Sequence, residues 1–336
     1  MPSLERGSNR IVIAGASSLL GAELRSLLEE GRFAGADFRL VDEELAEGTL
    51  TQAGGEPAVI QPVEEGSFDK ARLIFFTGSS DFTVANFEMA SRSGAVIIDL
   101  SGHSVSFANT FLWYPGVEKL GGQAFPEKAH LAAVPSAAAE GVVRLSLALR
   151  ELGTKHMVVT VFQPVSAAGK GGIDELETQT KQLLSFQTPG KELFDAQVAF
   201  NSLDRYGPQS RFDLKHARLT LRNEIRACLR NEVVLPAVQL VHVPVFYGVT
   251  FAACAKLEDG ANKEAISGAW ERGGFAILDE SGIGPSNISA AGETLIQLSE
   301  PKADQLQPGS WWFWAAADNI RLPAWNAVKL AEKLVP

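Results

Sequence analysis

The chain has 336 residues, of which 46% are hydrophobic and 21% are charged. This composition is typical of a globular protein with about two domains and a sizeable core. The formal net charge of -10, without clusters of Lys and Arg, argues against nucleic acid and anionic membranes as partners. The N-terminus lacks the apolar core of a secretory signal, and no stretch approaches the roughly 18 apolar residues of a membrane span. We therefore expect a cytoplasmic protein.

Short apolar runs alternate with amphipathic segments over the first 135 residues, which is typical of a doubly wound parallel sheet. The pattern predicts strands at Arg10–Ala14, Phe38–Val41, Leu73–Phe76 and Val96–Leu100, and helices at Ala22–Glu30 and Val84–Arg92. The first domain is therefore expected to have an α/β fold.

The character of the sequence changes near Ala137, where the apolar runs become longer. The pattern predicts strands at His156–Val165, Val238–Phe246 and Thr250–Leu257, and helices at Gly172–Leu184, Leu214–Leu229 and Pro323–Leu334. Long strands with few helices between them favour a mixed or antiparallel sheet, one face of which is available to a partner. Alternation along a strand at Trp311–Trp314 would bury half of this aromatic run and leave the rest on the sheet face, as core or interface. The polar stretch Gln187–Gln209 is expected to be an exposed excursion, and the last helix is expected to pack against the first domain.

A glycine-flanked turn, Gly15–Gly21, lies between the first expected strand and the first expected helix. Such turns let the backbone approach a pyrophosphate, whose charge is met by N–H groups at the helix N-terminus. The cofactor-binding residues expected here are Gly15, Ser17, Ser18, Leu19 and Gly21. Ser18 stands where the G-x-x-G-x-x-G pattern has its middle glycine, and its Cβ would crowd a dinucleotide. Alternatively, the two outer glycines only permit a close crossing of strand and helix.

The second expected strand ends at an acidic residue, Asp42. A carboxylate at this place can accept hydrogen bonds from the ribose hydroxyls of NAD, whereas it repels the additional phosphate of NADP. If a dinucleotide binds, NAD is therefore favoured over NADP. The alternative interpretation is a solvated strand end.

Only two cysteines occur, Cys228 and Cys254, so a disulfide framework and a thiolate metal cluster are both excluded. Both have apolar neighbours, and we expect buried structural thiols. The histidines at 130, 156 and 216 show no spacing typical of a metal site, and no metal is expected.

The chain resembles the aspartate-semialdehyde dehydrogenase family over nearly its whole length. Six segments in the family's order carry the resemblance: Gly15–Gly21, Val96–Ser101, Val134–Ser136, Phe162–Gly169 with Glu175 and Gln179, Val243–Gly248, and Asp318–Arg321 with Asn326. The resemblance implies a Rossmann-like dinucleotide-binding domain at 1–135 plus 320–336. It also implies an α+β dimerisation domain with a mixed sheet at 136–319, and therefore a homodimer.

The resemblance also implies a reactive centre, and most of it is missing. Where the enzymes read N-P-N-C, this chain reads Val134-Pro135-Ser136-Ala137, so Ala137 occupies the nucleophile position. Where they read R-V-P-V-x-x-G-H, this chain begins with His242 and ends with Val249, which replaces the acid–base histidine. Alanine cannot attack a carbonyl and valine cannot shuttle a proton. His242 could pair with a substrate carboxylate, although without the bidentate fork of arginine.

Other family positions are partly kept. The polar E-E-x-K pattern is replaced by Ala217-Arg218-Leu219-Thr220, and the phosphate-binding arginine aligns with about Val105. The retained residues are Gln163, which the resemblance places beside the reacting carbon, and Asn319, which it places on the cofactor side. Ser136 could supply a hydroxyl if a base lay within reach. His103, in the loop that holds the family's arginine, is a candidate ligand contact or a surface histidine.

Two hypotheses follow from these losses. The first is a family member without catalytic activity that serves as a dimeric scaffold, a partner subunit, or a nucleotide or metabolite sensor. The second is an NAD(P)-dependent oxidoreductase with rearranged chemistry, for example noncovalent hydride transfer assisted by Gln163 and a water molecule. Members of a catalytic unit fail together rather than additively, so the joint loss of nucleophile and base favours the first.

Overall fold

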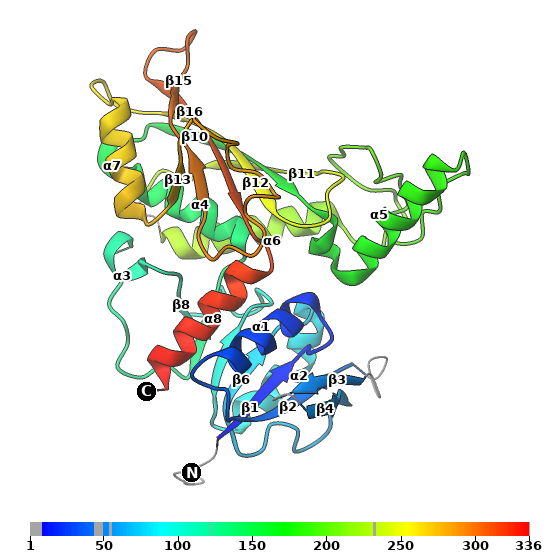
Figure 1. Cartoon of the computed structure of the whole chain (residues 1–336). Coiled ribbons are helices and arrows are strands. Elements are labelled where there is room, and N and C mark those ends of the chain that lie inside the picture. The colour runs from blue at the N-terminus through cyan, green and yellow to red at the C-terminus, as the bar shows by residue number, and fades with distance from the viewer. Residues whose placement is uncertain (1–8, 44–49, 54–55, 122, 231–232, 336) are drawn as a thin grey trace. The chain divides into compact units, whose positions relative to one another are not determined.

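The structure is a computed structural model that describes residues 9–43, 50–53, 56–121, 123–230 and 233–335 (Figure 1). It divides into two compact units. Unit 1 comprises Met1–Pro115, Ala124–Pro135 and Pro323–Pro336, and unit 2 comprises Gly116–Gln123 and Ser136–Leu322.

Unit 1 is built on a parallel seven-stranded sheet in the order β5-β2-β1-β6-β7-β9-β8. Its strands are β1 (Arg10–Ala14), β2 (Asp37–Asp42), β5 (Gln61–Pro62), β6 (Ala71–Phe76), β7 (Val96–Asp99), β8 (Phe111–Leu112) and β9 (Leu131–Ala133). The helices are α1 (Leu19–Glu30), α2 (Ser80–Arg92) and most of α8 (Arg321–Leu334), and a separate hairpin pairs β3 (Leu50–Ala53) with β4 (Glu56–Val59). The predicted doubly wound α/β fold is confirmed, since apolar strands such as Ile11–Ala14 are buried on both faces.

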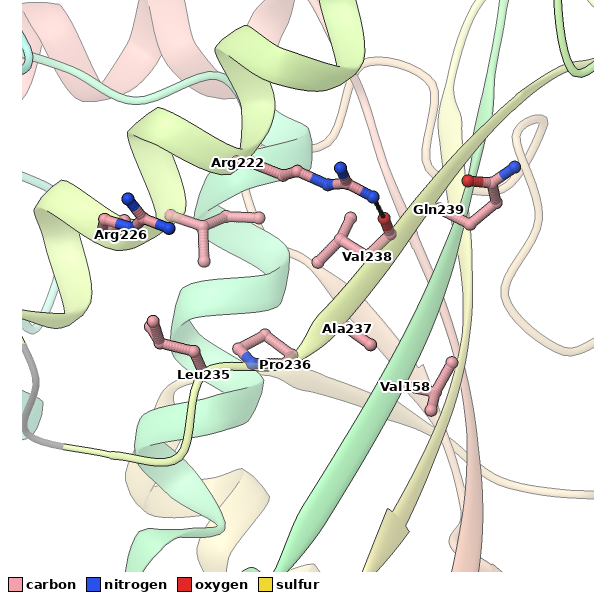
Figure 2. Close-up of a pocket in the computed structure, with 9 residues that line it drawn as sticks. Val158, Arg222, Arg226, Leu235, Pro236, Ala237, Val238 and Gln239 are labelled. Atoms are coloured by element: carbon pink, nitrogen blue, oxygen red, sulfur yellow. Dashed lines mark hydrogen bonds between the residues drawn. The ribbon is translucent and has the colours of Figure 1, made fainter. Parts of the chain in front are cut away.

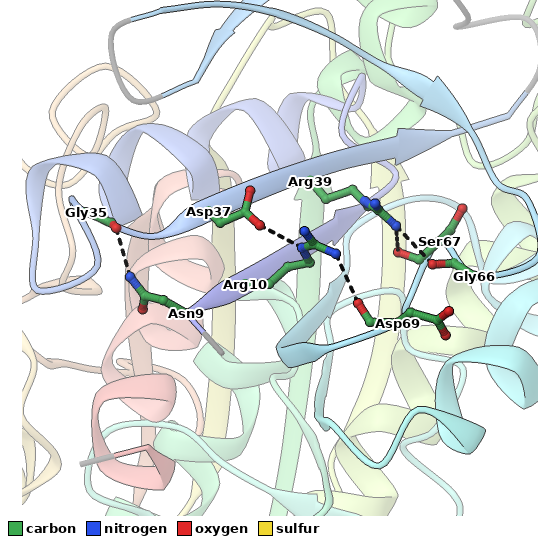
Figure 3. A network of polar contacts seen from close by, with 8 residues as sticks. All are labelled: Asn9, Arg10, Gly35, Asp37, Arg39, Gly66, Ser67 and Asp69. Carbon is green, nitrogen blue, oxygen red and sulfur yellow. Dashed lines mark hydrogen bonds and ion pairs between the residues drawn. The ribbon is translucent and has the colours of Figure 1, made fainter. Parts of the chain in front are cut away.

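Polar side chains fix the N-terminal ends of β1 and β2 (Figure 3). Arg10 pairs with Asp37 across the two strands at 2.7 Å and also reaches the carbonyl of Asp69. Arg39 donates to the carbonyls of Gly66 and Ser67 at 2.9 and 3.2 Å. These bonds tie the 66–69 turn to the sheet at the end opposite to the Gly15–Gly21 turn, so the carboxyl ends of the strands remain available for a ligand.

Unit 2 is built on a mixed sheet in the order β11-β10-β12-β16-β14-β13, with β15 paired to β16. Its strands are β10 (His156–Gln163), β11 (Ala237–His242), β12 (Val249–Lys256), β13 (Ala276–Leu278), β14 (Gln297–Ser299), β15 (Lys302–Ala303) and β16 (Ser310–Ala317). Its helices are α3 (Val117–Leu120), α4 (Ala137–Ala148), α5 (Gly169–Leu184), α6 (Leu214–Leu229) and α7 (Lys263–Gly273), with 3-10 turns at Arg150–Leu152 and Val165–Ala168. The predicted mixed sheet is confirmed, because β10 is parallel to β11 and antiparallel to β12.

Buried and exposed side chains alternate along β16, as predicted. Phe313 is buried against Trp270 in the core, whereas Trp312 and Trp314 are 47% and 38% exposed on the opposite face of the sheet. Cys254 lies on the same face as these tryptophans, because it is out of phase with the buried Ala253 and Ala255. Cys254 and Cys228 are both half-buried, so the expectation of buried thiols was wrong at both positions.

Two predicted segments differ from the structure. The strand expected at Val238–Phe246 ends at His242, because Pro244 follows and has no N–H to continue a ladder. The excursion expected to be exposed at Gln187–Gln209 contains wholly buried residues at Phe194 and Val198. They pack on α5 with Val165 and Leu176 in a separate small core.

Helix α4 is anchored by an ion pair in the core of unit 2. Glu140 and Arg144 are one helical turn apart, 2.7 Å from each other, and at most 2% exposed. Arg144 also donates to the carbonyls of Gly273 and Gly274 at the end of α7, and its guanidinium lies over the ring of Phe275. One side chain therefore joins α4 to the C-terminal end of α7.

Replacement of Arg144 by methionine is expected to lower the free energy of unfolding of unit 2 by about 3–5 kcal/mol, because Glu140 loses its countercharge in a buried site. Urea denaturation followed by circular dichroism measures the change. Lys181→Met is the matched control, since Lys181 and Glu177 form an exposed pair with the same spacing on α5. Equal midpoints for the two variants would show that the buried pair contributes nothing.

Candidate functional site

The Gly15–Gly21 turn connects β1 to α1, and close packing requires both of its glycines. Gly15 has a φ of +90°, and a Cβ there would lie 2.1 Å from the backbone nitrogen of Gly78. A Cβ on Gly21 would lie 2.6 Å from the carbonyl oxygen of Gly15. The close crossing is therefore real. It is compatible with a phosphate cradle, although it needs no ligand to explain it.

The side chain of Ser18 is turned toward the protein. It is the N-cap of α1, where its Oγ accepts from the N–H of Gly21 at 2.9 Å and donates to the carbonyl of Thr77 at 2.9 Å. Leu19 is the first residue of the helix. Because its hydroxyl is fixed in this way, Ser18 contributes a helix cap in place of the glycine of the pattern.

Asp42 ends β2 directly beside this turn and is 7% exposed. One carboxylate oxygen accepts from the N–H of Ser17 at 2.7 Å, and the other accepts from the N–H of Glu43 at 2.9 Å. The two bonds fix the carboxylate next to the turn, with lone pairs remaining on both oxygens. The carboxylate therefore lies next to the turn with acceptor sites available to a hydrogen-bond donor.

His103 lies in a loop that Asp99 organises. The carboxylate of Asp99 is wholly buried and accepts from the N–H and hydroxyl groups of Ser101 and Ser104 at 2.6–2.8 Å. The ring of His103 packs edge-on against Phe87 and Phe107, with centroids 5.4 and 5.0 Å away. Aromatic packing therefore explains His103 without a ligand.

The nucleophile position implied by the resemblance lies at the first turn of α4. Ala137 is the first residue of the helix and is 2% exposed. Ser136 is the N-cap, and its Oγ accepts from the N–H of Ala139. The Ser136 hydroxyl donates to Glu224 at 2.6 Å, and its backbone N–H donates to the other oxygen of the same carboxylate at 3.2 Å.

Glu224 is the site residue that sequence reasoning missed. It lies on α6 and is 4% exposed, on a buried stripe with Leu221, Ile225 and Leu229. An acidic residue within the apolar stripe of an amphipathic helix is the signal that could have pointed to it, because a buried carboxylate needs hydrogen-bond donors. The structure shows that the donors belong to Ser136.

Gln163 and His242 are register partners at the ends of β10 and β11. The side-chain nitrogen of Gln163 is buried and has no hydrogen-bond partner in the part of the chain that the structure describes. His242 is wholly buried, with Nδ1 3.1 Å from the hydroxyl of Tyr206 and Nε2 3.5 Å from the carbonyl of Val198. Burial lowers the pKa of His242 and raises that of Tyr206 far above its usual value. A neutral, enclosed imidazole is poorly suited to the expected role of holding a substrate carboxylate.

Val249 and Asn319 lie at the turn that precedes β12. Val249 begins β12 and is 2% exposed, and Gly248 before it has a φ of +82° with Asn287 against it. The amide oxygen of Asn319 accepts from the N–H of Gly248 at 2.8 Å, and its amide nitrogen donates to Ser166. The turn is therefore held by Asn319, while the residue expected to carry the base is an apolar part of the core.

Neither a metal cluster nor a membrane span is found within the described ranges. No group of three or more His, Cys, Asp and Glu side chains there could hold a metal ion. None of the helices in those ranges is long and apolar enough to cross a membrane. Cys228 is beside Glu224, and burial raises the pKa of its thiol far above the usual value, so a reactive thiolate is not favoured.

Relatives align with almost the entire chain. A "USG-1 protein homolog" of Azotobacter vinelandii is 29% identical over 97% of both chains. "Aspartate-semialdehyde dehydrogenase 2" of Vibrio cholerae is 25% identical over 97% of both. The solved structure of a "probable aspartate-semialdehyde dehydrogenase from Pseudomonas aeruginosa" has a TM-score of 0.85, with 25% identity over 97% of this chain and 98% of that one.

Two family profiles cover most of the chain. "Semialdehyde dehydrogenase, NAD binding domain" matches residues 10–112, and "Semialdehyde dehydrogenase, dimerisation domain" matches residues 146–322. The first match contains the Gly15–Gly21 turn and Asp42, and the second contains the mixed sheet of unit 2. The chain therefore belongs to the semialdehyde dehydrogenase family.

Proposed function

We propose that this protein is a noncatalytic member of the semialdehyde dehydrogenase family that binds NAD as a homodimer and serves as a scaffold or as a nucleotide or metabolite sensor. The observation that carries the proposal is Ala137, a buried methyl at the helix position where the resemblance implies a nucleophile. A thiolate there would be stabilised by the amides of α4 and would attack the substrate, whereas a methyl group has no lone pair.

Ser136 is the neighbouring hydroxyl, and Glu224 is a carboxylate within reach of it at 2.6 Å, but we propose that this pair serves as a helix cap and not as a nucleophile with its base. The hydroxyl of Ser136 caps α4 and donates to Glu224, which also holds the Ser136 backbone. The hydroxyl therefore uses both its proton and a lone pair in hydrogen bonds that fix the start of α4. The position implied for the base is Val249, which has no titrating group.

The purified protein is expected to show no NAD- or NADP-linked oxidation of aspartate semialdehyde in the presence of phosphate, because Ala137 and Val249 occupy the positions implied for the nucleophile and the base. The absorbance of the reduced nicotinamide measures the reaction in both directions. Gln163→Ala is the matched control, since it alters the retained pocket residue without touching the helix. Turnover by the wild type that Gln163→Ala abolishes would contradict the proposal.

The second candidate is an oxidoreductase of the aspartate-semialdehyde dehydrogenase type with rearranged chemistry. It is favoured by the buried amide nitrogen of Gln163, which lacks a protein acceptor among the described residues and could donate to a substrate carbonyl. Relatives named aspartate-semialdehyde dehydrogenase also favour it. The turnover assay separates the candidates, because only this one requires hydride transfer.

The carboxylate of Asp42 supports the choice of NAD. It is held by the N–H of Ser17 at the mouth of the turn, where it can accept from a ribose hydroxyl. Asp42 would hold the adenosine ribose of a bound NAD, and the nicotinamide would supply the hydride transfer that only the second candidate requires. NADP carries a phosphate at that hydroxyl, which a fixed negative charge disfavours.

Calorimetry is expected to show tighter binding of NAD than of NADP, and Asp42→Ser is expected to weaken NAD binding about 10-fold or more. The reason is the loss of a charge-assisted hydrogen bond worth about 1.5–3 kcal/mol. Glu43→Gln removes the same charge from the exposed neighbour and is the control. Equal NAD affinity of the wild type and Asp42→Ser would refute the assigned role of Asp42.

We further propose that His242 has become a packing residue. Its ring lies among Phe194 and Tyr206, and burial lowers its pKa. Because the folded pKa lies below the unfolded value of about 6.5, His242 stabilises the protein fully above that pH. The unfolded chain takes up the proton first as the pH falls, so stability is lost below about pH 6.5.

The free energy of unfolding of the wild type is expected to decrease by about 1 kcal/mol more than that of His242→Gln when the pH falls from about 7.5 to about 5.5. Urea titrations at the two pH values give the difference. His216→Gln, a change at an exposed histidine on α6, should retain the wild-type decrease. Parallel pH profiles for the wild type and His242→Gln would show that His242 is not held neutral.

A further inference from the structure

Helix α6 carries a row of three arginines beside the edge strand of the unit 2 sheet. Arg218, Arg222 and Arg226 follow one another at intervals of four residues, so they lie on one side of the helix. None of them forms an ion pair with a residue in the described ranges. The single acidic residue of α6, Glu224, is buried and bound to Ser136. The row is therefore a local concentration of positive charge in a chain whose net charge is -10.

The first two arginines of the row are bound to the backbone of β11. Arg218 donates to the carbonyls of Asp204 and Leu240 at 3.0 and 3.2 Å, and Arg222 donates to the carbonyl of Val238 at 2.8 Å. Four residues of a helix advance about 6 Å and two residues of a strand advance about 6.6 Å. Because these spacings match, successive arginines meet alternate residues of the strand.

The third step of this pattern is different. The residue of the strand that would meet Arg226 is Pro236, and the guanidinium of Arg226 has no acceptor within the described ranges. A cavity of about 390 Å³ lies at this step, between α6 and the start of β11 (Figure 2). Arg222 lines the same cavity, and the guanidinium groups of both arginines retain N–H donors for a further acceptor.

Apart from the two arginines and Gln239, the residues that line the cavity are apolar. Ile225 belongs to α6, whereas Leu235, Pro236 and Ala237 lie across the cavity from that helix. Leu235 is 41% exposed, although it is a large apolar side chain. No acidic side chain of the described residues lines the cavity. The cavity therefore places guanidinium donors beside an apolar surface that water can reach.

These properties select an anion with an apolar body. Guanidinium groups recognise carboxylates through paired N–H donors. An inorganic anion would leave the apolar wall in contact with water, whereas an uncharged hydrocarbon would leave the arginines without a countercharge. Ligand pockets commonly have volumes of about 300–1,000 Å³, with mostly apolar walls and a few convergent polar groups. This cavity lies near the lower end of that range, which suits a small ligand.

We propose that the cavity between α6 and β11 binds a medium-chain aliphatic carboxylate. Arg226 and Arg222 hold its anionic end, and its chain covers Ile225, Leu235 and Pro236. All of these residues belong to unit 2, whereas Asp42 belongs to unit 1. The carboxylate site is thus built from different residues than the proposed NAD site, and it gives a metabolite sensor a class of ligand other than a nucleotide.

Calorimetry of the full-length protein with hexanoate tests the site. The wild type is expected to bind one hexanoate per chain about 10-fold or more tightly than 1-hexanol, which has the same chain length without the charge. Inorganic phosphate is expected to bind about 10-fold or more weakly than hexanoate, because it covers none of the apolar wall. Equal affinity for hexanoate and either of these probes would contradict the ligand class.

Variants on the two sides of the cavity assign the binding to it. Arg226→Gln is expected to weaken hexanoate binding about 10-fold or more, because a charge-assisted hydrogen bond is lost. Leu235→Ser is expected to weaken it about 5-fold or more, because less apolar surface is covered. Both side chains are exposed, so the fold does not depend on them. Lys215→Gln is the matched control, since it removes the same charge from an exposed position of α6 that does not line the cavity.

The possible results separate this site from the other proposals. A wild type that binds no hexanoate at millimolar concentrations lacks the site. Equal hexanoate affinities of Arg226→Gln, Leu235→Ser and Lys215→Gln would place the binding elsewhere and overturn the proposal. A hexanoate affinity that falls as the protein concentration rises would also overturn it, because a second copy would then occupy the cavity. NAD binding and its loss in Asp42→Ser are measured independently, so either site can fail without the other.

Discussion

The carboxylate of Glu224 determines what the first turn of α4 can do. A helix N-terminus presents free amides and a partial positive charge, which an enzyme of this family would use to lower the pKa of a thiol. In this chain Glu224 holds both the hydroxyl and the N–H of Ser136, and Ser136 caps the helix. The buried ion pair one turn later fixes the same helix to α7. The helix is thus stabilised by residues around a position that carries only a methyl group.

The other family positions follow the same physical pattern. At 249 a valine joins the buried side of β12, and at 242 an imidazole lies among aromatic rings. Each group suits a packed interior better than the charged or titrating residue that the resemblance implies, because an unpaired charge there would require a partner. Active sites commonly cost stability, so packing groups at these positions agree with the proposed absence of catalysis. The turn beside Asp42 has not changed in this way, because its carboxylate still lies at the mouth of the dinucleotide-binding motif.

The sequence predicted the fold well because its signals were local and periodic. The strand at Arg10–Ala14 is buried on both faces, and the strand that contains Trp311–Trp314 is buried on one. The spacing of apolar residues in the sequence indicates both patterns directly. The hydrophobic period could not predict contacts between residues that are distant in the sequence. The bond between Ser136 and Glu224 joins residues separated by 88 positions, and Phe194 is buried in an aromatic cluster with Tyr206 and the distant His242. Periodicity also gave no sign that Ser18 turns inward to Thr77, since a cap and a ligand contact require the same residue type.

The exposed sheet surface and the altered site involve different parts of unit 2. The positions that depart from the pattern implied by the resemblance lie at strand ends and at the start of α4, whereas β16 carries two exposed tryptophans, Trp312 and Trp314. Exposed aromatic rings reduce solubility, and a monomer gains nothing from keeping them. In the proposed homodimer, a second copy that covered these rings would remove that cost without a reactive centre. The proposed assembly through the sheet and the reactive centre implied by the resemblance therefore depend on different side chains of the same unit.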